Sequence, residues 1–242
     1  MIWAMKLAAD ILSEESGRTV PDGYWDVSVT DVLHCPLRVW FQKRGEKVDP
    51  RYMILQDYIL TLGRVAHNVL EAVLGGEHEV PVVHKFEREG VKIAVKGRAD
   101  VVLRDAVIEI KTYAYSLPKS MFPKYAMQAI FYAAKLNKGK AMLLMFNRAT
   151  AEVHVAYLHL FKGVRTLDKA IERFEELKRK TVEIIEDRAY RLYKVLHGER
   201  PSPEPGPWCK YCPYRNNCII RDMGNKLALY DPKNFVVEKV LP

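Results

Sequence analysis

The placement of the four cysteines is the feature of this sequence that most constrains its fold. Cys209, Cys212 and Cys218 lie close together near the C-terminus, and Cys35 stands alone near the N-terminus. The spacing of the three is typical of metal ligands, and a fourth thiol from a distant segment would complete a tetrahedral site. The sequence therefore predicts a metal centre that ties the two ends of the chain together.

The composition fits an ordinary globular protein whose thiols stay reduced. The chain has 242 residues, 49% hydrophobic and 28% charged, which predicts one large domain or one domain with a small appendage. No apolar run reaches the roughly 18 residues that span a bilayer, and the charged stretch 1–15 is unlike a secretory signal. We expect a cytoplasmic protein with no membrane segment. Disulfides are rare in that compartment, which favours metal binding by the cysteines.

The charge balance indicates a polyanionic partner. The formal net charge is +8 and the isoelectric point is near 9.2. Such a surface attracts nucleic acid first and an anionic membrane surface second. Charge alone does not distinguish the two.

Hydrophobic periodicity and turn residues predict an α/β architecture, a sheet flanked by helices. We divide the chain into an N-terminal helical segment (1–53), a core that includes a long last helix (54–200) and a C-terminal cysteine segment with a tail (201–242). The sequence has no G-x-x-x-x-G-K-[ST] loop, so we expect no ATPase motor in it. Helices are expected at 28–44, 54–74, 119–136 and 163–196, and strands at 79–86, 91–95, 99–103, 107–111, 141–146 and 152–160.

Two neighbouring strands carry charged residues where apolar ones are expected. Asp100 lies on one strand, and Glu109 and Lys111 lie two apart on the next, so they share one face of the sheet. Two carboxylates beside an ammonium can bind Mg²⁺ or Mn²⁺ and activate a water for phosphodiester hydrolysis. A structural ion pair explains the residues equally well. The same spacing at Glu176 and Lys178 lies in a charged helix, where we expect an exposed pair.

Three further residues are weak signals when taken singly. His67 follows Gly63 by one helical turn, and a histidine packed against a helix face is its simplest interpretation. Gln128 and Tyr132 are four apart and share a helix face, where Tyr132 alone would be a core aromatic residue.

In order along the chain, these residues resemble the motifs of RecB-like nucleases of the PD-(D/E)XK superfamily. With Cys35 upstream and the cysteine run downstream, the chain resembles the CRISPR-associated RecB-like iron–sulfur exonuclease family over about residues 35–218. Ala99 stands where the superfamily has a proline, which leaves Asp100 in place. The motifs are Gly63-x-x-x-His67, Gly97-Arg98-x-Asp100, Glu109-Ile110-Lys111 and Gln128-x-x-x-Tyr132.

The resemblance implies a restriction-endonuclease-like mixed sheet and a role for each motif residue. Lys111 would serve the attacking water, and Gln128 and Tyr132 would support the site or position the DNA. The implied Mn²⁺ or Mg²⁺ ligands are His67, Asp100, Glu109 and the main-chain carbonyl of Ile110. The implied ligands of a [4Fe–4S] cluster are Cys35, Cys209, Cys212 and Cys218.

The resemblance also implies an activity: exonuclease cleavage of single-stranded DNA, commonly 5′→3′. It implies a role in CRISPR adaptation, where such enzymes process spacer precursors beside the CRISPR integrase. Two alternatives stay open. One is a non-catalytic DNA-binding adaptor of the integration complex, and the other is the detached nuclease domain of a helicase–nuclease.

Zinc is the alternative occupant of the four thiols. Structural zinc sites more often show two Cys-x-x-Cys pairs, whereas Cys35 and Cys212 are each followed by proline, as in ferredoxin-type sites, which favours iron–sulfur. The long helix mixes basic and acidic residues, which favours a solvated face over a DNA groove. Trp208, Tyr211 and Tyr214 would either stack on bases or shield the cluster.

Overall fold

The computed structural model describes residues 23–48, 50–158, 166–198, 200–206, 209, 212–214, 218 and 235–241. The expected helix start at 163 and strand end at 160 lie outside these ranges, as does the N-terminal stretch 1–15. The helices are α2 (Val29–Val32), α3 (Pro36–Lys43), α4 (Pro50–Val73), the 3₁₀ turn η1 (Lys119–Met121), α5 (Phe122–Lys135) and α6 (Leu167–Leu196). The strands are β1 (Trp25–Ser28), β2 (Glu77–Arg88), β3 (Val91–Val102), β4 (Ala106–Tyr113), β5 (Lys140–Asn147), β6 (Val153–Leu158) and β7 (Phe235–Leu241).

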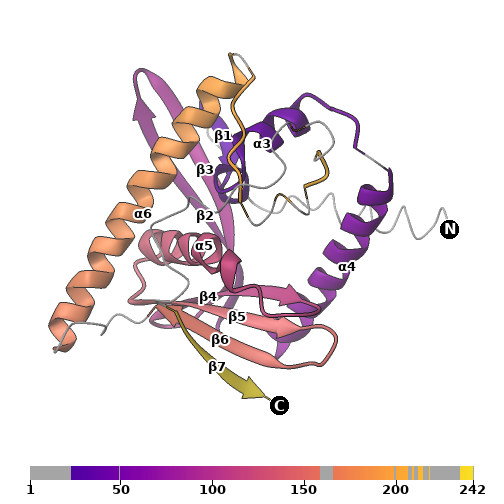
Figure 1. Cartoon of the computed structure of the whole chain (residues 1–242). Coiled ribbons are helices and arrows are strands. Elements are labelled where there is room, and N and C mark those ends of the chain that lie inside the picture. The colour runs from indigo at the N-terminus through magenta and orange to yellow at the C-terminus, as the bar shows by residue number, and fades with distance from the viewer. Residues whose placement is uncertain are drawn as a thin grey trace.

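The strands form one mixed sheet in the order β1-β3-β4-β5-β6-β7, with β2 also paired to β3. The pairs β1–β3 and β4–β5 are parallel, and the others are antiparallel. Helices lie on both sides: α6 and α4 stand at opposite edges of the molecule, and α5 lies between α6 and the strands (Figure 1). The predicted α/β architecture, a mixed sheet flanked by helices, is confirmed.

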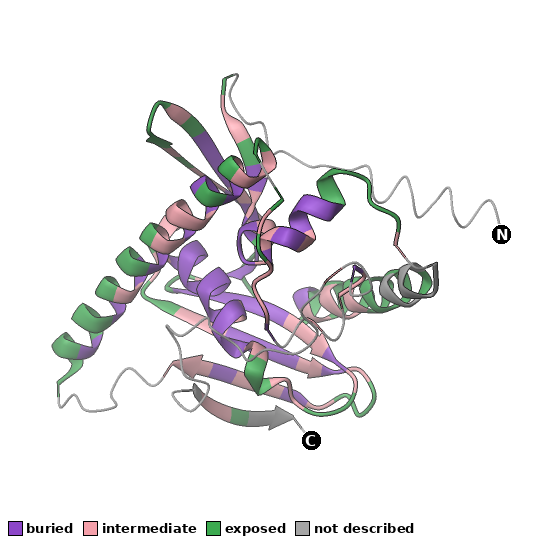
Figure 2. Ribbon diagram, turned by 45° about the horizontal axis from the view of Figure 1, so that its top comes forward, coloured by how far each residue is buried: buried purple, intermediate pink, exposed green. Residues whose placement is uncertain are grey.

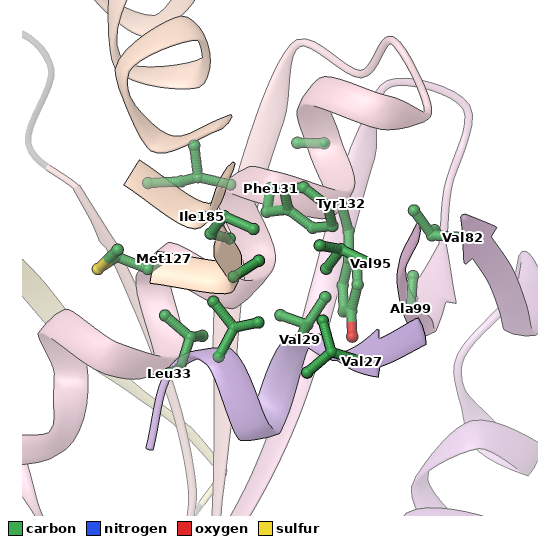
Figure 3. Packing of buried hydrophobic residues seen from close by; sticks show 14 of the residues in the cluster. Val27, Val29, Leu33, Val82, Val95, Ala99, Met127, Phe131, Tyr132 and Ile185 are labelled. Atoms are coloured by element: carbon green, nitrogen blue, oxygen red, sulfur yellow. The ribbon is translucent and has the colours of Figure 1, made fainter. Parts of the chain in front are cut away.

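Helix α5 is the centre of the hydrophobic core. Figure 2 shows it buried along nearly its whole length. Figure 3 shows its residues Met127 and Phe131 packed with Ile185 of α6, Val95 of β3 and Leu33 after α2. Because apolar residues occupy almost every position of α5, this helix can be covered on all sides. The core thereby fixes α5 against the strands that carry the acidic residues.

The helix expected at 28–44 is two helices, so that prediction is wrong. Ser28 caps α2 by accepting a hydrogen bond from Asp31 N at 3.0 Å. Pro36 begins α3, and the proline ring excludes the helical conformation for the residue before it, so Cys35 is extended at φ −60° and ψ 126°. The break lifts Cys35 out of a helix and makes it the N-cap residue of α3.

The two strands expected at 91–95 and 99–103 are one continuous strand, β3. The charged residues between them were interpreted as a break, but each has a partner on a neighbouring strand. Lys96 pairs with Asp26 of β1, and Arg98 with Glu79 of β2, both at 2.5 Å. Strand β7 was not expected in the tail, and it pairs with β6 at the sheet edge.

Helix α4 fits its predicted position but leaves much of its apolar surface exposed. Ile59, Val65, Val69 and Val73 are exposed, and Figure 2 shows the helix largely open to solvent. Its inner side contacts β3 and β4. Within the described part of the chain, no helix combines the length and apolar character needed to cross a membrane.

Candidate active site and cysteine pocket

The site lies in a fork where β3 and β4 separate. The two strands pair only at Val101↔Ile108 and Val102↔Val107, next to the turn that joins them. Beyond that point, the Asp100 carboxylate takes the place of the main-chain ladder and its Oδ2 accepts a hydrogen bond from Ile110 N at 2.6 Å. This bond places Asp100 beside the Glu109-Ile110-Lys111 segment.

Glu109 and Lys111 form an ion pair inside the fork. Glu109 is fully buried, its Oε1 accepts from the Lys111 ammonium, and its Oε2 has no hydrogen-bond partner. Burial and the nearby Asp100 raise the pKa of Glu109 to about 8, against the opposing effect of Lys111. Burial alone would lower the pKa of Lys111, but the Glu109 and Asp100 carboxylates outweigh it and raise the pKa. Two acids held this close favour a cation or a proton between them.

Helix α4 brings His67 to the same fork. Its Nδ1 lies 3.9 Å from Asp100 Oδ2. Burial lowers the pKa of His67, and Asp100 and a hydrogen bond with the Ile110 main chain act in the opposite direction. A methyl group at Gly63 would meet Thr112 Oγ1 at 3.6 Å, an ordinary contact, so the described neighbours do not require a glycine there.

Glu71 is a further member of the site, and the sequence analysis missed it. It lies one turn after His67 on α4, with its Oε1 4.0 Å from His67 Nδ1. It is only 8% exposed, and Oε1 has no hydrogen-bond partner. Burial, with Glu79 and Asp100, raises the pKa of Glu71. Its spacing of four from His67 and its place within an apolar run were the available signals.

Gln128 and Tyr132 reach the fork from α5. Gln128 Nε2 donates to the Tyr132 hydroxyl at 3.3 Å, and both side chains are buried. Figure 3 shows the Tyr132 ring extending from α5 toward the strands. A Cβ at Gly97 would lie 2.7 Å from the ring atom Cε1 and closer still to the hydroxyl, so a glycine is needed on β3. Burial and the Glu109 charge raise the pKa of Tyr132.

The donor set of the fork suits a hard divalent cation. Among the described residues, no three His, Cys, Asp or Glu side chains are already arranged to hold a metal ion. However, two buried carboxylate oxygens, Glu109 Oε2 and Glu71 Oε1, have no hydrogen-bond partner. A buried, unpartnered carboxylate oxygen is costly, and a cation bound between such oxygens removes the cost. The seven residues predicted for this site all lie at the fork, but three of their side chains are not yet arranged as ligands of one ion. These residues are His67, Asp100, Glu109, Ile110, Lys111, Gln128 and Tyr132.

The four cysteines line one cavity beside α3. They are all free thiols, and the cavity of about 430 Å³ includes space open to solvent. The hydrophobic cluster beneath it contains Trp40, Phe41 and Tyr214, with the last two rings stacked at 5.3 Å. The other residues that line it include Leu37, Arg38, Pro203, Glu204 and Pro205.

Main-chain amides point at the cysteine sulfurs. Glu204 N donates to Cys35 Sγ and Gly206 N to Cys209 Sγ, each at 3.2 Å. Burial raises the pKa of the Cys35 and Cys212 thiols, whereas amides near each sulfur act in the opposite direction. Amide donors around sulfur are typical of thiolates that bind a metal or cluster. The residues present therefore fit the predicted four-thiolate centre.

The structure describes one of the three aromatic residues near the cysteines, and it also describes Lys178 of α6. Tyr214 is buried against Phe41, which fits shielding of the cysteine pocket, and Trp208 and Tyr211 lie outside the described residues. Lys178 was expected to be exposed, but it is buried because it donates to Lys138 O at 3.2 Å and pairs with Glu175.

The rest of α6 behaves as a charged, solvated helix where it is described. Its ion pairs within the helix include Lys180–Glu176, Arg179–Glu183 and Arg191–Asp187. Basic side chains that are already paired with acids contribute little to a DNA groove.

The chain is similar to a curated exonuclease in one part. It is 34% identical over 95 residues to the CRISPR-associated exonuclease Cas4 of Saccharolobus solfataricus, which is 36% of this chain and 46% of that protein. The chain thus matches about half the length of this relative.

A solved structure and a family model cover more of the chain. The crystal structure of SSO0001 aligns with a TM-score of 0.59 over 92% of this chain and 98% of that chain, at 24% identity, which shows the shared fold. The model of the PD-(D/E)XK nuclease superfamily matches residues 74–219, a range that contains Asp100, Glu109, Lys111 and the cysteine triplet. On this match and on the geometry of the fork, the chain belongs to the PD-(D/E)XK nuclease superfamily.

Proposed function

We propose that the protein is a metal-dependent DNA exonuclease whose active site is the fork between β3 and β4. The observation that carries the proposal is the convergence of Asp100, Glu109 and Lys111 within a buried site, with Glu109 Oε2 lacking a hydrogen-bond partner. His67, Asp100, Glu109 and the Ile110 carbonyl would hold Mn²⁺ or Mg²⁺, and Glu71 is a further candidate ligand. The bound ion supplies charge neutralisation on the phosphate and a poised water.

The protein side chains divide the remaining work. Lys111 carries its positive charge beside the carboxylates, where it can orient the attacking water and stabilise the negative charge that develops on the phosphate. The Ile110 N–H fixes the Asp100 carboxylate. Gln128 and Tyr132 close the site from α5, with a direct hydrogen bond between them.

Cleavage assays with single substitutions test this assignment. Glu109→Ala and Lys111→Ala should each lower the rate of Mn²⁺-dependent cleavage of end-labelled single strands by about 10²-fold or more. Glu176→Ala is the matched control, because Glu176 has the same spacing to a lysine but lies exposed and paired with Lys180 on α6.

Full activity in Glu109→Ala or Lys111→Ala would remove the active-site assignment. DNA binding without metal-stimulated cleavage in the unsubstituted protein would instead favour a non-catalytic adaptor.

We propose further that Cys35, Cys209, Cys212 and Cys218 hold a [4Fe–4S] cluster that braces the N-terminal segment against the C-terminal one. The shared cavity and the amide donors to sulfur support four-thiolate binding, and zinc would use the same residues. Iron, acid-labile sulfide and zinc analysis of anaerobically purified protein distinguishes the two. Stoichiometric zinc without sulfide would exclude the cluster.

The likeness to the Cas4 exonuclease supports a CRISPR-associated exonuclease. On the motif resemblance we propose further that the protein degrades single-stranded DNA with 5′→3′ polarity and processes spacer precursors in CRISPR adaptation, in the cytoplasm and beside the CRISPR integrase. The division into segments 1–53, 54–200 and 201–242 belongs to the same proposal. Digestion of strands labelled at the 5′ or the 3′ end determines polarity, and preferential attack from the 3′ end would overturn that part.

A further inference from the structure

A cationic cluster between the fork and the cysteine pocket has no role in the proposed function so far. Lys124 of α5 is only 4% exposed, and its Nζ lies 3.0 Å from Nδ1 and 3.1 Å from Nε2 of His34. Arg38 of α3 approaches the same imidazole, with Nη1 3.3 Å from Nδ1. We call Lys124, His34 and Arg38 the cationic cradle.

The contacts within the cradle concentrate positive charge. A neutral imidazole has one N–H and one acceptor nitrogen, so whichever nitrogen carries the proton directs a donor toward Lys124. The imidazole therefore offers one acceptor nitrogen to the two cations. Burial, together with the charges of Lys124, Arg38 and Arg188, lowers the pKa of His34 to about 2, so the imidazole is neutral.

Most of the charged groups around the cradle are positive. Burial lowers the pKa of Lys124, as do Arg38, Lys111 and Arg188, whereas Asp31 raises it. Glu204 is already engaged by Arg188 at 2.7 Å. Such a cluster is suited to an anion with several acceptor oxygens.

The position of Lys124 connects the cradle to the active site. Lys124, Gln128 and Tyr132 are spaced by four residues, so they form one row along α5. The ring of Tyr125 lies 5.4 Å from the Lys111 ammonium, which shows that the first turn of α5 stands next to the fork. At the other end, Arg38 lines the cysteine pocket.

We propose that the cationic cradle binds one backbone phosphate of the DNA strand whose scissile phosphate lies in the fork. Lys124 forms the buried floor of this subsite, and the half-buried His34 and Arg38 form its rim. The subsite holds the strand in register with the catalytic carboxylates and directs it along the cysteine pocket. This inference rests on the proposed nuclease function.

Binding to a fluorescein-labelled single strand of about twelve nucleotides, in a Glu109→Gln background that prevents cleavage, tests the subsite. Lys124→Met should weaken binding by about 5-fold to 20-fold and reduce the slope of log K against log salt by about 0.7. Lys124→Arg should keep the slope. Lys140→Met is the matched control, because Lys140 is an exposed lysine paired with Asp105 at the edge of the turn that joins β3 to β4.

A strand series with one neutral methylphosphonate at successive positions locates the phosphate. One position should weaken binding to the parent protein and have no effect on Lys124→Met. If Lys124→Met does not fold, Arg38→Gln provides the same comparison with intact Lys124.

The outcomes separate the two proposals. An unchanged salt slope in Lys124→Met, or equal sensitivity of the parent and the variant to every methylphosphonate, would overturn the subsite while cleavage by the Glu109 protein stands. Absence of both cleavage in the unsubstituted protein and DNA binding in the Glu109→Gln background would overturn the nuclease proposal itself.

Discussion

At the residue scale, the proposed active site depends on buried charged side chains that stabilise one another. Glu109 is fully buried, and it is stabilised by the Lys111 ammonium on one oxygen. The second oxygen remains available, and so does an oxygen of Glu71. Burial raises the pKa of a carboxyl group that has no partner, unless a bound cation stabilises its negative charge. Nucleases of this superfamily bind a divalent cation.

Gly97 is the residue at which the backbone of β3 lies close to the Tyr132 ring. Gly97→Ala should lower the free energy of unfolding by about 2 kcal/mol, because the new Cβ would overlap the Tyr132 ring. Urea denaturation measures this change. Tyr132→Phe removes the nearest atom, so Gly97→Ala should cost less in that background. Gly75→Ala is the control, since no atom lies within 4 Å of a Cβ there. Equal stability of Gly97→Ala and the parent would show that the ring moves aside freely.

At the element scale, short polar contacts hold helices and strands in register. His84 of β2 links two helices: its Nε2 lies 2.6 Å from Glu186 Oε1 on α6, and its Nδ1 lies 3.2 Å from Lys135 Nζ on α5. Its ring also stacks on Phe86. These contacts hold β2, α5 and α6 together.

This link makes stability depend on pH. Burial and Lys135 lower the pKa of His84 below its usual 6.5, and Glu186 opposes them. Below that pH the unfolded chain binds a proton that the folded chain resists, so stability is present above the unfolded pKa and is lost as the pH falls. His84→Gln should lose less stability than the parent between about pH 7.5 and about pH 5.5.

Urea denaturation across the pH range measures this difference. The exposed His78→Gln serves as the control and should follow the parent. A parallel loss in His84→Gln and the parent would mean that His84 does not contribute.

At the scale of the whole molecule, Arg188 joins three segments that are far apart in sequence. From α6, its Nε donates to Val32 O at 2.8 Å and its Nη2 to His34 O at 3.1 Å, and it pairs with Glu204. These partners lie before Cys35 and before Cys209, so Arg188 holds both sides of the cysteine pocket.

Arg188→Met should lower the free energy of unfolding by about 2 kcal/mol, because two carbonyls lose a charged donor. It should also speed release of iron from the proposed cluster to a chelator. Arg191→Met is the control, as Arg191 is 68% exposed and pairs only within α6 in the described contacts. Chemical denaturation and timed metal release measure both effects. Identical behaviour of the two variants would show that Arg188 is not a structural link.

The sequence alone determined which residue types are available for the proposed chemistry, and the tertiary structure decided which groups share a site. The motif residues from His67 to Tyr132, the α/β architecture and the cysteine spacing are local patterns, because residue type and periodicity are properties of short segments. Glu71, the requirement for Gly97, the burial of Lys178 and the approach of Lys124 to His34 depend on segments far apart in the chain.

The two errors in the expected elements have different origins. The break at Cys35 follows from one proline and was available locally, but the continuity of β3 depends on Asp26 and Glu79 of neighbouring strands, which no window of sequence contains. Burial and pairing are set by what packs against a residue. Only the folded chain brings the acids together at the fork and the four thiols together in one cavity.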